Sequence, residues 1–370
     1  MVTAQGHTSS LFNGVGKPSA LIPSNARAPR TARLPSLRSA SIENPVVETM
    51  ELGKSGVEVS SIGIGAWSWG DRSGYWGYGS EYGKEDSREV FKSLIDAGIT
   101  FIDTAEVYGY GKSEEFIGEF SRELEAAPVI GTKFAPLPWR QTSGTVPNAL
   151  RASLNRLQMD SVGLYMIHWP GFFLNAFSND AYVEGLATCV KEGLTKAIGV
   201  SNFREDRIRS AHRVLGERGI PLATNQVQYS LLYRQPERNG VLETCKELGI
   251  TPVAYSPLCQ GLLTGKYTPD NLPGGQRKLT LKSNFVTDIQ PLLKLMKEIG
   301  EKHDGKTCAQ VAINWVLCKG ALPIPGAKTI KQMEEITGAL GWRLTADEVE
   351  ALDDLSGDLT MSTGAPFENW

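Results

Sequence analysis

The chain has 370 residues, of which 41% are hydrophobic, and a formal net charge of −3. This length suits one large domain or two small ones, with enough apolar side chains for a sizeable core. No apolar run reaches the roughly 18 residues that span a bilayer, and a nucleic-acid groove would require a marked basic excess. A membrane-spanning protein and a nucleic-acid-binding protein are therefore disfavoured.

The five cysteines are scattered along the chain and include no Cys-x-x-Cys pair (Cys189, Cys245, Cys259, Cys308 and Cys318). This pattern is typical of free thiols in a reducing compartment rather than of a disulfide framework or a zinc site. The four histidines are far apart in the sequence. We therefore expect no metal centre.

The first 42 residues differ in composition from the rest of the chain. They contain no Asp or Glu, many Ser, Ala and Pro, and five cations (Lys17, Arg27, Arg30, Arg33 and Arg38). This composition, without the apolar segment of a secretory signal, predicts a disordered transit peptide over residues 1–42 that directs the protein to the chloroplast stroma. A basic tail without a targeting role is the alternative. Loss of the five cations would leave residues 43–370 acidic, with a formal charge of about −8.

Residues 48–61, ETMELGKSGVEVSS, are typical of a short β-hairpin. They place two β-like segments on either side of a Lys-Ser-Gly turn. We expect this hairpin to close the bottom of the domain that follows.

From residue 61 onward, short apolar runs alternate with amphipathic stretches. The eight runs are residues 61–67, 101–105, 129–134, 162–169, 196–203, 223–230, 251–258 and 322–327, and the helix candidates between them include residues 87–98, 146–158 and 207–219. Strands that alternate with helices of this length predict a parallel sheet. Eight such units in about 280 residues predict an α/β fold, a closed (β/α)8 TIM barrel, within residues 43–370.

A doubly wound open sheet is the alternative fold. Its dinucleotide site requires G-x-G-x-x-G after the first strand, whereas the first run here is followed by AWSWGDRSGYWGYG, which lacks that spacing. Residues 259–286 form a long segment that contains Gly and Pro, and loops of this length in compact domains are usually binding loops or lids.

Four chemically useful side chains lie where predicted strands end, which is where active sites of such barrels lie. Asp103 ends the second strand, Tyr108 follows five residues later, Lys133 ends the third strand and His168 ends the fourth. Each residue alone has an ordinary structural explanation, such as a helix cap or a packed side chain. All four together predict one site on one rim.

A phenol, an ammonium, a carboxylate and an imidazole are suited to proton donation to a carbonyl oxygen. Tyrosine has an ordinary pKa of about 10, and a nearby ammonium is expected to lower the pKa of Tyr108 and make it a better acid. We expect Asp103 to pair with Lys133, and His168 to orient the substrate oxygen. No side chain here supplies a hydride, so a cofactor must do so.

The sequence FIDTAEVYG, with the lysine and histidine on the next two strands, closely resembles the aldo-keto reductase family. The resemblance extends from about residue 50 to about residue 355, and the chain is similar to the plastid pyridoxal reductase-like members of the family. It implies NADPH-dependent reduction of an aldehyde or ketone to an alcohol. It assigns Tyr108 as the proton donor, Lys133 and Asp103 as the pair that lowers its pKa, and His168 as the substrate-orienting residue.

The same resemblance implies a nicotinamide site on the later strands. Ser201, Asn202 and Gln226 are expected to bind the carboxamide, and Tyr255 to stack on the ring. The segment after Tyr255 resembles the loop that folds over the pyrophosphate. The remaining residues assigned to this part of the cofactor are Gly65, Ala66, Trp67, Asp103, Ser256, Pro257, Leu258, Gly261, Leu263 and Lys266. Cys259, in this loop, is either a neutral replacement or a redox-sensitive thiol.

The segment PIPGAKTIKQMEEI after the last strand resembles the family's adenosine site. Lys328 would bind the 2′-phosphate, and Gln332 and Glu335 the adenine, while Gly326 allows close approach of the backbone. The start of a helix adds a favourable dipole for the phosphate. Ile336 stands where the family often has Asn, and Lys328 is a point charge without arginine's bidentate geometry. NADPH is favoured over NADH.

The predicted rim is rich in aromatic side chains, namely Trp67, Trp69, Tyr75, Trp76, Tyr78, Trp139, Trp169 and Phe172. Such a wall suits an aromatic aldehyde, including pyridoxal-type aldehydes, or it packs the loops against the barrel. The alternative function is an NADPH-binding interaction module that resembles channel-associated β subunits and turns over slowly. A catalytically dead stress protein is disfavoured because none of the four residues is lost.

Overall fold

The computed structural model describes residues 47–272, 283–359 and 361. The predicted transit peptide, residues 1–42, and the centre of the predicted binding loop lie outside the described residues. Within the described ranges, none of the helices has both the length and the apolar character needed to cross a membrane.

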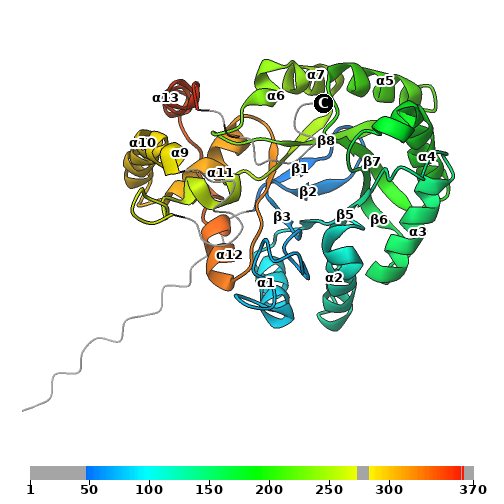
Figure 1. Cartoon of the computed structure of the whole chain (residues 1–370), viewed down its shortest axis with the longest axis horizontal. Helices are drawn as coiled ribbons and strands as arrows, with labels where there is room; N and C mark the ends of the chain where they lie inside the picture. Colours follow the sequence, from blue (N-terminus) through cyan, green and yellow to red (C-terminus); the bar gives the residue numbers. More distant parts are fainter. Residues whose placement is uncertain (1–46, 273–282, 360, 362–370) are drawn as a thin grey trace, which may run out of the picture. The chain divides into compact units, whose positions relative to one another are not determined.

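Eight strands form one parallel sheet in which each strand pairs with its neighbours in the sequence (Figure 1). They are β3 (Gly63–Gly65), β4 (Phe101–Asp103), β5 (Val129–Phe134), β6 (Val162–Ile167), β7 (Thr195–Ser201), β8 (Leu222–Gln228), β9 (Thr251–Tyr255) and β10 (Leu322–Ile324). The first and last strands meet just beyond β10, where Gly65 pairs with Gly326 and donates its N–H to the carbonyl oxygen of Pro325 at 3.0 Å. The sheet therefore closes into the predicted (β/α)8 barrel, and the open-sheet alternative is wrong.

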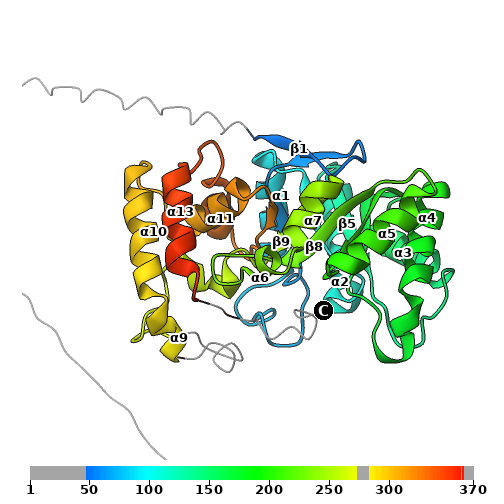
Figure 2. The same ribbon diagram turned by 90° about the horizontal axis from the view of Figure 1, so that it is seen from above.

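A helix follows each strand and lies in a ring around the barrel (Figure 1). These helices are α1 (Lys84–Asp96), α2 (Lys112–Glu123), α3 (Thr145–Leu157), α4 (Asn179–Lys191), α5 (Glu205–Gly216), α7 (Val241–Leu248), α11 (Cys308–Cys318) and α12 (Ile330–Thr337). The additional elements are α6 (Gln235–Arg238), α9 (Ser283–Asp288), α10 (Gln290–Lys302), α13 (Ala346–Ser356) and three 3₁₀ segments, η1 (Tyr108–Gly111), η2 (Phe173–Ser178) and η3 (Cys259–Thr264). In both views α10 and α13 lie side by side (Figures 1 and 2).

The predicted hairpin forms from β1 (Thr49–Glu51) and β2 (Glu58–Ser60), which are antiparallel. Its apolar residues Leu52, Val57 and Val59 are buried in one cluster with side chains that fill the barrel interior. Gly53 has φ +59°, and a side-chain carbon there would lie 2.6 Å from the carbonyl oxygen of Ala223, so only glycine fits. The hairpin closes the bottom of the barrel, as predicted, and the loop that follows β3 lies at the opposite end (Figure 2).

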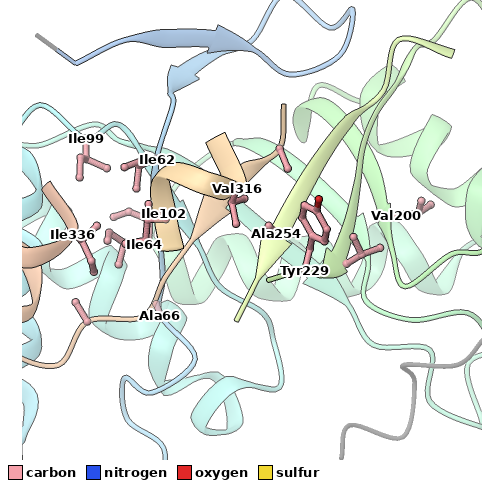
Figure 3. Close-up of a cluster of buried hydrophobic side chains, with 14 of the residues drawn as sticks. Ile62, Ile64, Ala66, Ile99, Ile102, Val200, Tyr229, Ala254, Val316 and Ile336 are labelled. Atoms are coloured by element: carbon pink, nitrogen blue, oxygen red, sulfur yellow. The ribbon is translucent and has the colours of Figure 1, made fainter. Parts of the chain in front are cut away.

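A second, larger cluster of apolar side chains lies between the sheet and the helices. Figure 3 shows Ile64 and Ile102 from the strands near Ile336 from α12. Burial of one such side chain contributes about 1.5–3 kcal/mol. This layer fixes the position of each helix against its strand, and thereby the loops that connect them.

The strands end earlier than the apolar runs predict. Residues 196–203 were expected to be one strand and residues 251–258 another, but β7 ends before Asn202 and β9 before Ser256. These two residues have φ +60° and +52°. A left-handed residue ends the ladder of backbone hydrogen bonds, and both turns direct the chain into the loops at the top of the barrel.

Candidate active site

A cavity of about 950 Å³ lies at the carboxyl ends of the barrel strands. Its lining comes from residues at or near the ends of β3, β4, β7, β8, β9 and β10, and from the segments that follow most strands of the barrel. This volume is at the upper end of the range for small-molecule and cofactor sites. The lining includes Tyr108 and His168, which follow β4 and β6, and Lys328 and Gln332, which follow β10, and we refer to these two parts as the two ends of the cavity.

Lys133 connects the polar residues at the floor of this cavity. Its ammonium donates to Asp103 Oδ2 at 2.6 Å, to the carbonyl oxygen of Thr104 at 2.7 Å and to the hydroxyl of Tyr108 at 3.3 Å. The side chains of Lys133 and Asp103 are 0% and 3% exposed. A buried ion pair of this kind requires every polar atom to be satisfied, and on the other side Gln226 Nε2 donates to Asp103 Oδ1 at 2.7 Å.

The turn after β4 places Tyr108 above Lys133. The backbone N–H of Tyr108 donates to the carbonyl oxygen of Ala105 at 3.0 Å, and η1 then continues with Tyr110 at φ +56°. The side chain of Tyr110 is 95% exposed and points into solvent. Two tyrosines two positions apart thus have opposite environments, and only Tyr108 lines the cavity.

The electrostatics of the site keep Tyr108 protonated. Burial, and then the carboxylate of Asp103, raise the pKa of the Tyr108 hydroxyl well above its ordinary value. The net direction is thus opposite to the lowered pKa that we expected for Tyr108, because burial outweighs the effect of the nearby ammonium. The charge of Lys133 is balanced by Asp103 at 2.6 Å, and burial lowers the pKa of Lys133 itself.

His168 follows directly after β6, and its ring lies 5.6 Å from that of Tyr108 in an edge-to-face arrangement. Burial, and then the charge of Lys133, hold the pKa of His168 well below its ordinary value. Its imidazole is therefore neutral at neutral pH. Among the described residues, its Nδ1 has no hydrogen-bond partner.

The ends of β7 and β9 meet beside this cluster. The hydroxyl of Tyr255 donates to Asn202 Oδ1 at 3.1 Å. Asn202 Nδ2 in turn donates to Ser201 Oγ at 3.1 Å and to the carbonyl oxygen of His168 at 3.2 Å. Residues from three different strands are thus bound to one another at the wall of the cavity.

At the far end of the cavity, the start of α12 is organised by its own side chains. Thr329 caps the helix, and Gln332 Oε1 accepts the backbone N–H of Lys328 at 2.7 Å. The ammonium of Lys328 reaches back to the carbonyl oxygen of Trp76 at 2.9 Å. Glu335 accepts from Thr307 Oγ1 at 2.5 Å.

Comparison with known proteins shows to which family the chain belongs. The model of the Aldo/keto reductase family matches residues 61–356. The chain belongs to the aldo/keto reductase family. It is therefore an enzyme of the family whose members reduce carbonyl groups with a nicotinamide dinucleotide.

Individual relatives agree with this assignment. The chain is 41% identical to the chloroplastic pyridoxal reductase of Arabidopsis thaliana over 302 residues, which are 79% of this chain and 82% of the relative. Among solved structures, it is similar to the glycerol dehydrogenase of Gluconobacter oxydans, with a TM-score of 0.72, 27% identity and coverage of 86% and 97% of the two chains. It is also similar to an aldo-keto reductase of Klebsiella pneumoniae in complex with NADPH, with a TM-score of 0.65, 28% identity and coverage of 84% and 95%.

The structure brings most of the residues predicted for the cofactor to the cavity. Those that line it are Gly65, Trp67, Asp103, Ser201, Asn202, Gln226, Tyr255, Ser256, Pro257, Leu258, Gly261, Lys266, Gly326, Lys328, Gln332 and Glu335. Ala66 and Leu263 are fully buried in the outer core instead, and Lys133 lies beneath the floor. Gln226 was expected to bind the carboxamide, but in this structure its Nε2 donates to Asp103.

The predicted aromatic rim separates into two groups. Trp67, Tyr75, Trp76 and Trp169 line the cavity. The others do not: Trp69 is fully buried and donates to the carbonyl oxygen of Ala327 at 3.0 Å. Tyr78 packs against Tyr82, and Trp139 is 74% exposed on the surface. Part of the rim therefore packs the loops, and part faces the site.

Sequence reasoning missed two residues that connect the loops across the cavity. The hydroxyl of Tyr75 donates to Gln260 Oε1 at 2.6 Å, although the two residues are 185 positions apart. Glu81 lies 3.4 Å from Lys328 and also lines the cavity. No periodicity or motif marks Gln260 or Glu81, because their importance comes only from the approach of distant loops.

None of the five cysteines, which all lie in the described ranges, forms a disulfide bond. Cys259 is fully buried, and its Sγ lies 3.9 Å from Met361 Sδ. Oxidation requires access of solvent to the thiol, so this burial favours the neutral interpretation of Cys259. In the ranges that the structure describes, no three His, Cys, Asp or Glu side chains gather in a way that could hold a metal ion.

Proposed function

We propose that this protein is an NADPH-dependent carbonyl reductase in which Tyr108 donates the proton to the carbonyl oxygen. The observation that carries this proposal is the buried Lys133 ammonium, held between the Asp103 carboxylate and the Tyr108 hydroxyl, both of which line a large cavity. A charged group is seldom fully buried without a partner or a function. Of the two side chains to which Lys133 donates, Tyr108 carries a phenol, which can donate a proton to a substrate in the cavity.

In the proposed reaction, Tyr108 gives up one proton to the substrate and later regains one. NADPH, when bound, supplies the hydride to the carbonyl carbon. The O–H bond of Tyr108 breaks, its proton forms the alcohol O–H, and the phenolate is stabilised by Lys133 Nζ at 3.3 Å. The phenolate then regains its proton from solvent. The neutral imidazole of His168, beside Tyr108, orients the substrate oxygen by hydrogen bonding.

The residues along the cavity fit a dinucleotide. Ser201, Asn202 and Tyr255 would hold the nicotinamide end, and the loop from Ser256 to Lys266 the pyrophosphate. Lys328 would bind the 2′-phosphate, beside the capped start of α12. The continuous lining between these two ends supports this placement, as does the NADPH named with the Klebsiella relative.

We propose an aromatic aldehyde, of the pyridoxal type, as the substrate. Trp67 is 43% exposed and stacks on Tyr75 and Tyr108, with ring centroids 6.3 and 6.1 Å apart. Its exposed face offers a flat surface beside the acid, and the similarity to pyridoxal reductase supports the choice. A panel that compares pyridoxal, benzaldehyde and linear aldehydes should give the highest kcat/KM for the aromatic members. Equal values for linear aldehydes would contradict this assignment.

The experiment that tests the catalytic assignment is Tyr108→Phe. Turnover should fall by roughly 10²–10⁴, the usual contribution of a positioned general acid, while the affinity for NADPH changes less than about threefold. The matched control is Tyr110→Phe, which changes an exposed tyrosine of the same turn. If Tyr108→Phe keeps more than about a tenth of the wild-type rate, Tyr108 is not the acid. Wild-type turnover near zero on every aldehyde would favour an interaction module instead.

We further propose that residues 1–42 direct the protein to plastids. The acid-free composition of this segment and the chloroplastic location in the name of the Arabidopsis relative support this proposal. A fluorescent protein fused to residues 1–55 should enter plastids. Fluorescence that stays in the cytosol would contradict it.

A further inference from the structure

The loop after β3 makes two contacts with Lys328, the residue that we assign to the 2′-phosphate. The ammonium donates to the carbonyl oxygen of Trp76 at 2.9 Å and lies 3.4 Å from Glu81 Oε2. The side chain of Lys328 is 16% exposed, whereas that of Glu81 is 61% exposed. The carboxylate of Glu81, on a solvated loop, thus already lies beside the ammonium with which an incoming phosphate would pair.

Contacts within its own loop hold Glu81 in position. Its backbone N–H donates to the carbonyl oxygen of Gly77 at 2.8 Å. A side-chain carbon at Gly77, which has φ +81°, would lie 2.6 Å from Cδ of Glu81. The Glu81 side chain therefore packs directly on the Gly77 backbone, and this packing directs its carboxylate toward Lys328. Glu81 and Lys328 both line the cavity.

We propose that Glu81 is a cofactor-specificity residue that disfavours a 2′-phosphate and so narrows the preference for NADPH over NADH. The inference rests on the proposed role of Lys328. A phosphate monoester carries close to two negative charges at neutral pH. Bound at Lys328, it would lie near the Glu81 carboxylate and be repelled by it. A nucleotide with a 2′-hydroxyl instead meets an acceptor for its proton, as in dinucleotide sites that bind NAD through an acidic residue.

Two adenosine fragments isolate this effect from catalysis. Adenosine 2′,5′-bisphosphate and adenosine 5′-monophosphate differ in the 2′-phosphate alone, and their affinities can be measured by isothermal titration calorimetry. Glu81→Gln should bind the bisphosphate about 3- to 10-fold more tightly than the wild type, since one nearby like charge is removed on a solvated loop. Its affinity for the monophosphate should change less than about twofold.

Glu85→Gln is the matched control. Glu85 lies in the first turn of α1 and pairs with Arg88 at 3.2 Å, so its substitution removes the same charge without touching Lys328. The ratio of the two affinities should stay at the wild-type value. In a Lys328→Met background, Glu81→Gln should lose its effect on this ratio, because the site for the phosphate is gone.

The outcomes separate this inference from the function on which it rests. The decisive quantity is the affinity for the bisphosphate divided by the affinity for the monophosphate. If this ratio is unchanged or lower in Glu81→Gln, or rises equally in Glu85→Gln, the proposed role of Glu81 is wrong. If Lys328→Met weakens both fragments equally, Lys328 does not bind the 2′-phosphate, and the proposed cofactor assignment fails at that point. Tighter bisphosphate binding in Glu81→Gln alone, lost with Lys328→Met, supports both.

Discussion

The two ends of the cavity are built in different ways. At the catalytic end, Lys133 and Asp103 extend from strands, are 0% and 3% exposed, and pair with each other. At the adenosine end, Lys328 precedes a helix and Glu81 lies on a loop, and the Glu81 side chain is 61% exposed. A buried charge acts in a low dielectric, and water cannot compensate for the loss of its partner. A solvated charge that loses its partner is stabilised by water instead. Substitutions should therefore change turnover by orders of magnitude at one end and affinity by smaller factors at the other.

The largest effect is expected for Lys133→Met. Turnover should fall by roughly 10²–10⁴, because the phenolate of Tyr108 loses the cation that stabilises it. The free energy of unfolding should also fall, by about 3–5 kcal/mol, because Asp103 is left as a buried carboxylate without its ion-pair partner. Single-turnover kinetics and urea unfolding measure the two losses separately.

The double variant Lys133→Met with Asp103→Asn separates packing from chemistry. It removes both charges of the pair, so much of the lost stability should return while turnover stays low. Recovery of turnover in the double variant would show that Lys133 serves only to balance Asp103, and that the site needs no ammonium.

At the adenosine end, Lys328→Ala should weaken NADPH binding by about 1–3 kcal/mol, the range for a lost charge-assisted hydrogen bond, or roughly 5- to 150-fold. NADH binding should stay nearly unchanged, and so should turnover at saturating NADPH. Nucleotide-dependent quenching of tryptophan fluorescence measures both affinities. An equal loss for the two nucleotides would show that Lys328 does not read the 2′-phosphate.

The same difference explains what the sequence could predict. The proposed catalytic residues lie at or next to strand ends, where the barrel topology decides which side chains meet. The order of strands was therefore enough to predict that Asp103, Lys133 and His168 lie on one rim. Two strand ends were predicted too late, because β7 and β9 end just before Asn202 and Ser256, and the positive φ of these residues leaves no trace in the hydrophobicity pattern.

At the adenosine end, the sequence predicted the residues of α12 but not their partners. Glu81 is one of many acidic residues, and nothing local distinguishes it from Glu85. Its contact with Lys328 depends on how a loop folds across 247 residues of sequence separation. The direction of the Tyr108 pKa was also predicted wrongly, because burial outweighs a cation that Asp103 already neutralises.

A smaller effect is expected at the contact that joins two loops over the middle of the cavity. Tyr75→Phe removes the hydrogen bond to Gln260 Oε1 and preserves the ring that packs on Trp67. One such bond contributes about 1 kcal/mol, so NADPH should dissociate about 3- to 10-fold faster, as measured by stopped-flow fluorescence. Tyr78→Phe is the control, because Tyr78 packs on Tyr82 and Phe116 instead. Equal rates in Tyr75→Phe and wild type would show that the loops do not retain the nucleotide.

The smallest effect is expected from pH, and it distinguishes the two ends most directly. The proposed mechanism requires a protonated Tyr108 and a neutral His168. The pKa of Tyr108 is raised above 10.0 and that of His168 is lowered below 6.5, so both stay in the required form across neutral pH. The pKa of Lys133 is lowered from 10.5, so the loss of its proton should end the plateau on the alkaline side. We expect kcat to vary less than about twofold across neutral pH and to fall on the alkaline side.

The adenosine end should respond to pH over the same range. The 2′-phosphate gains a proton near pH 6, so KM for NADPH should rise as the pH falls through that value, while KM for NADH stays level. The two nucleotides thus serve as controls for each other in one enzyme preparation. A fall of kcat near pH 6.5 with both nucleotides would show that His168 titrates at its ordinary pKa, and that the catalytic end is more solvated than its burial indicates. A rise in KM for NADH alongside that for NADPH would place the titrating group on the protein and not on the phosphate.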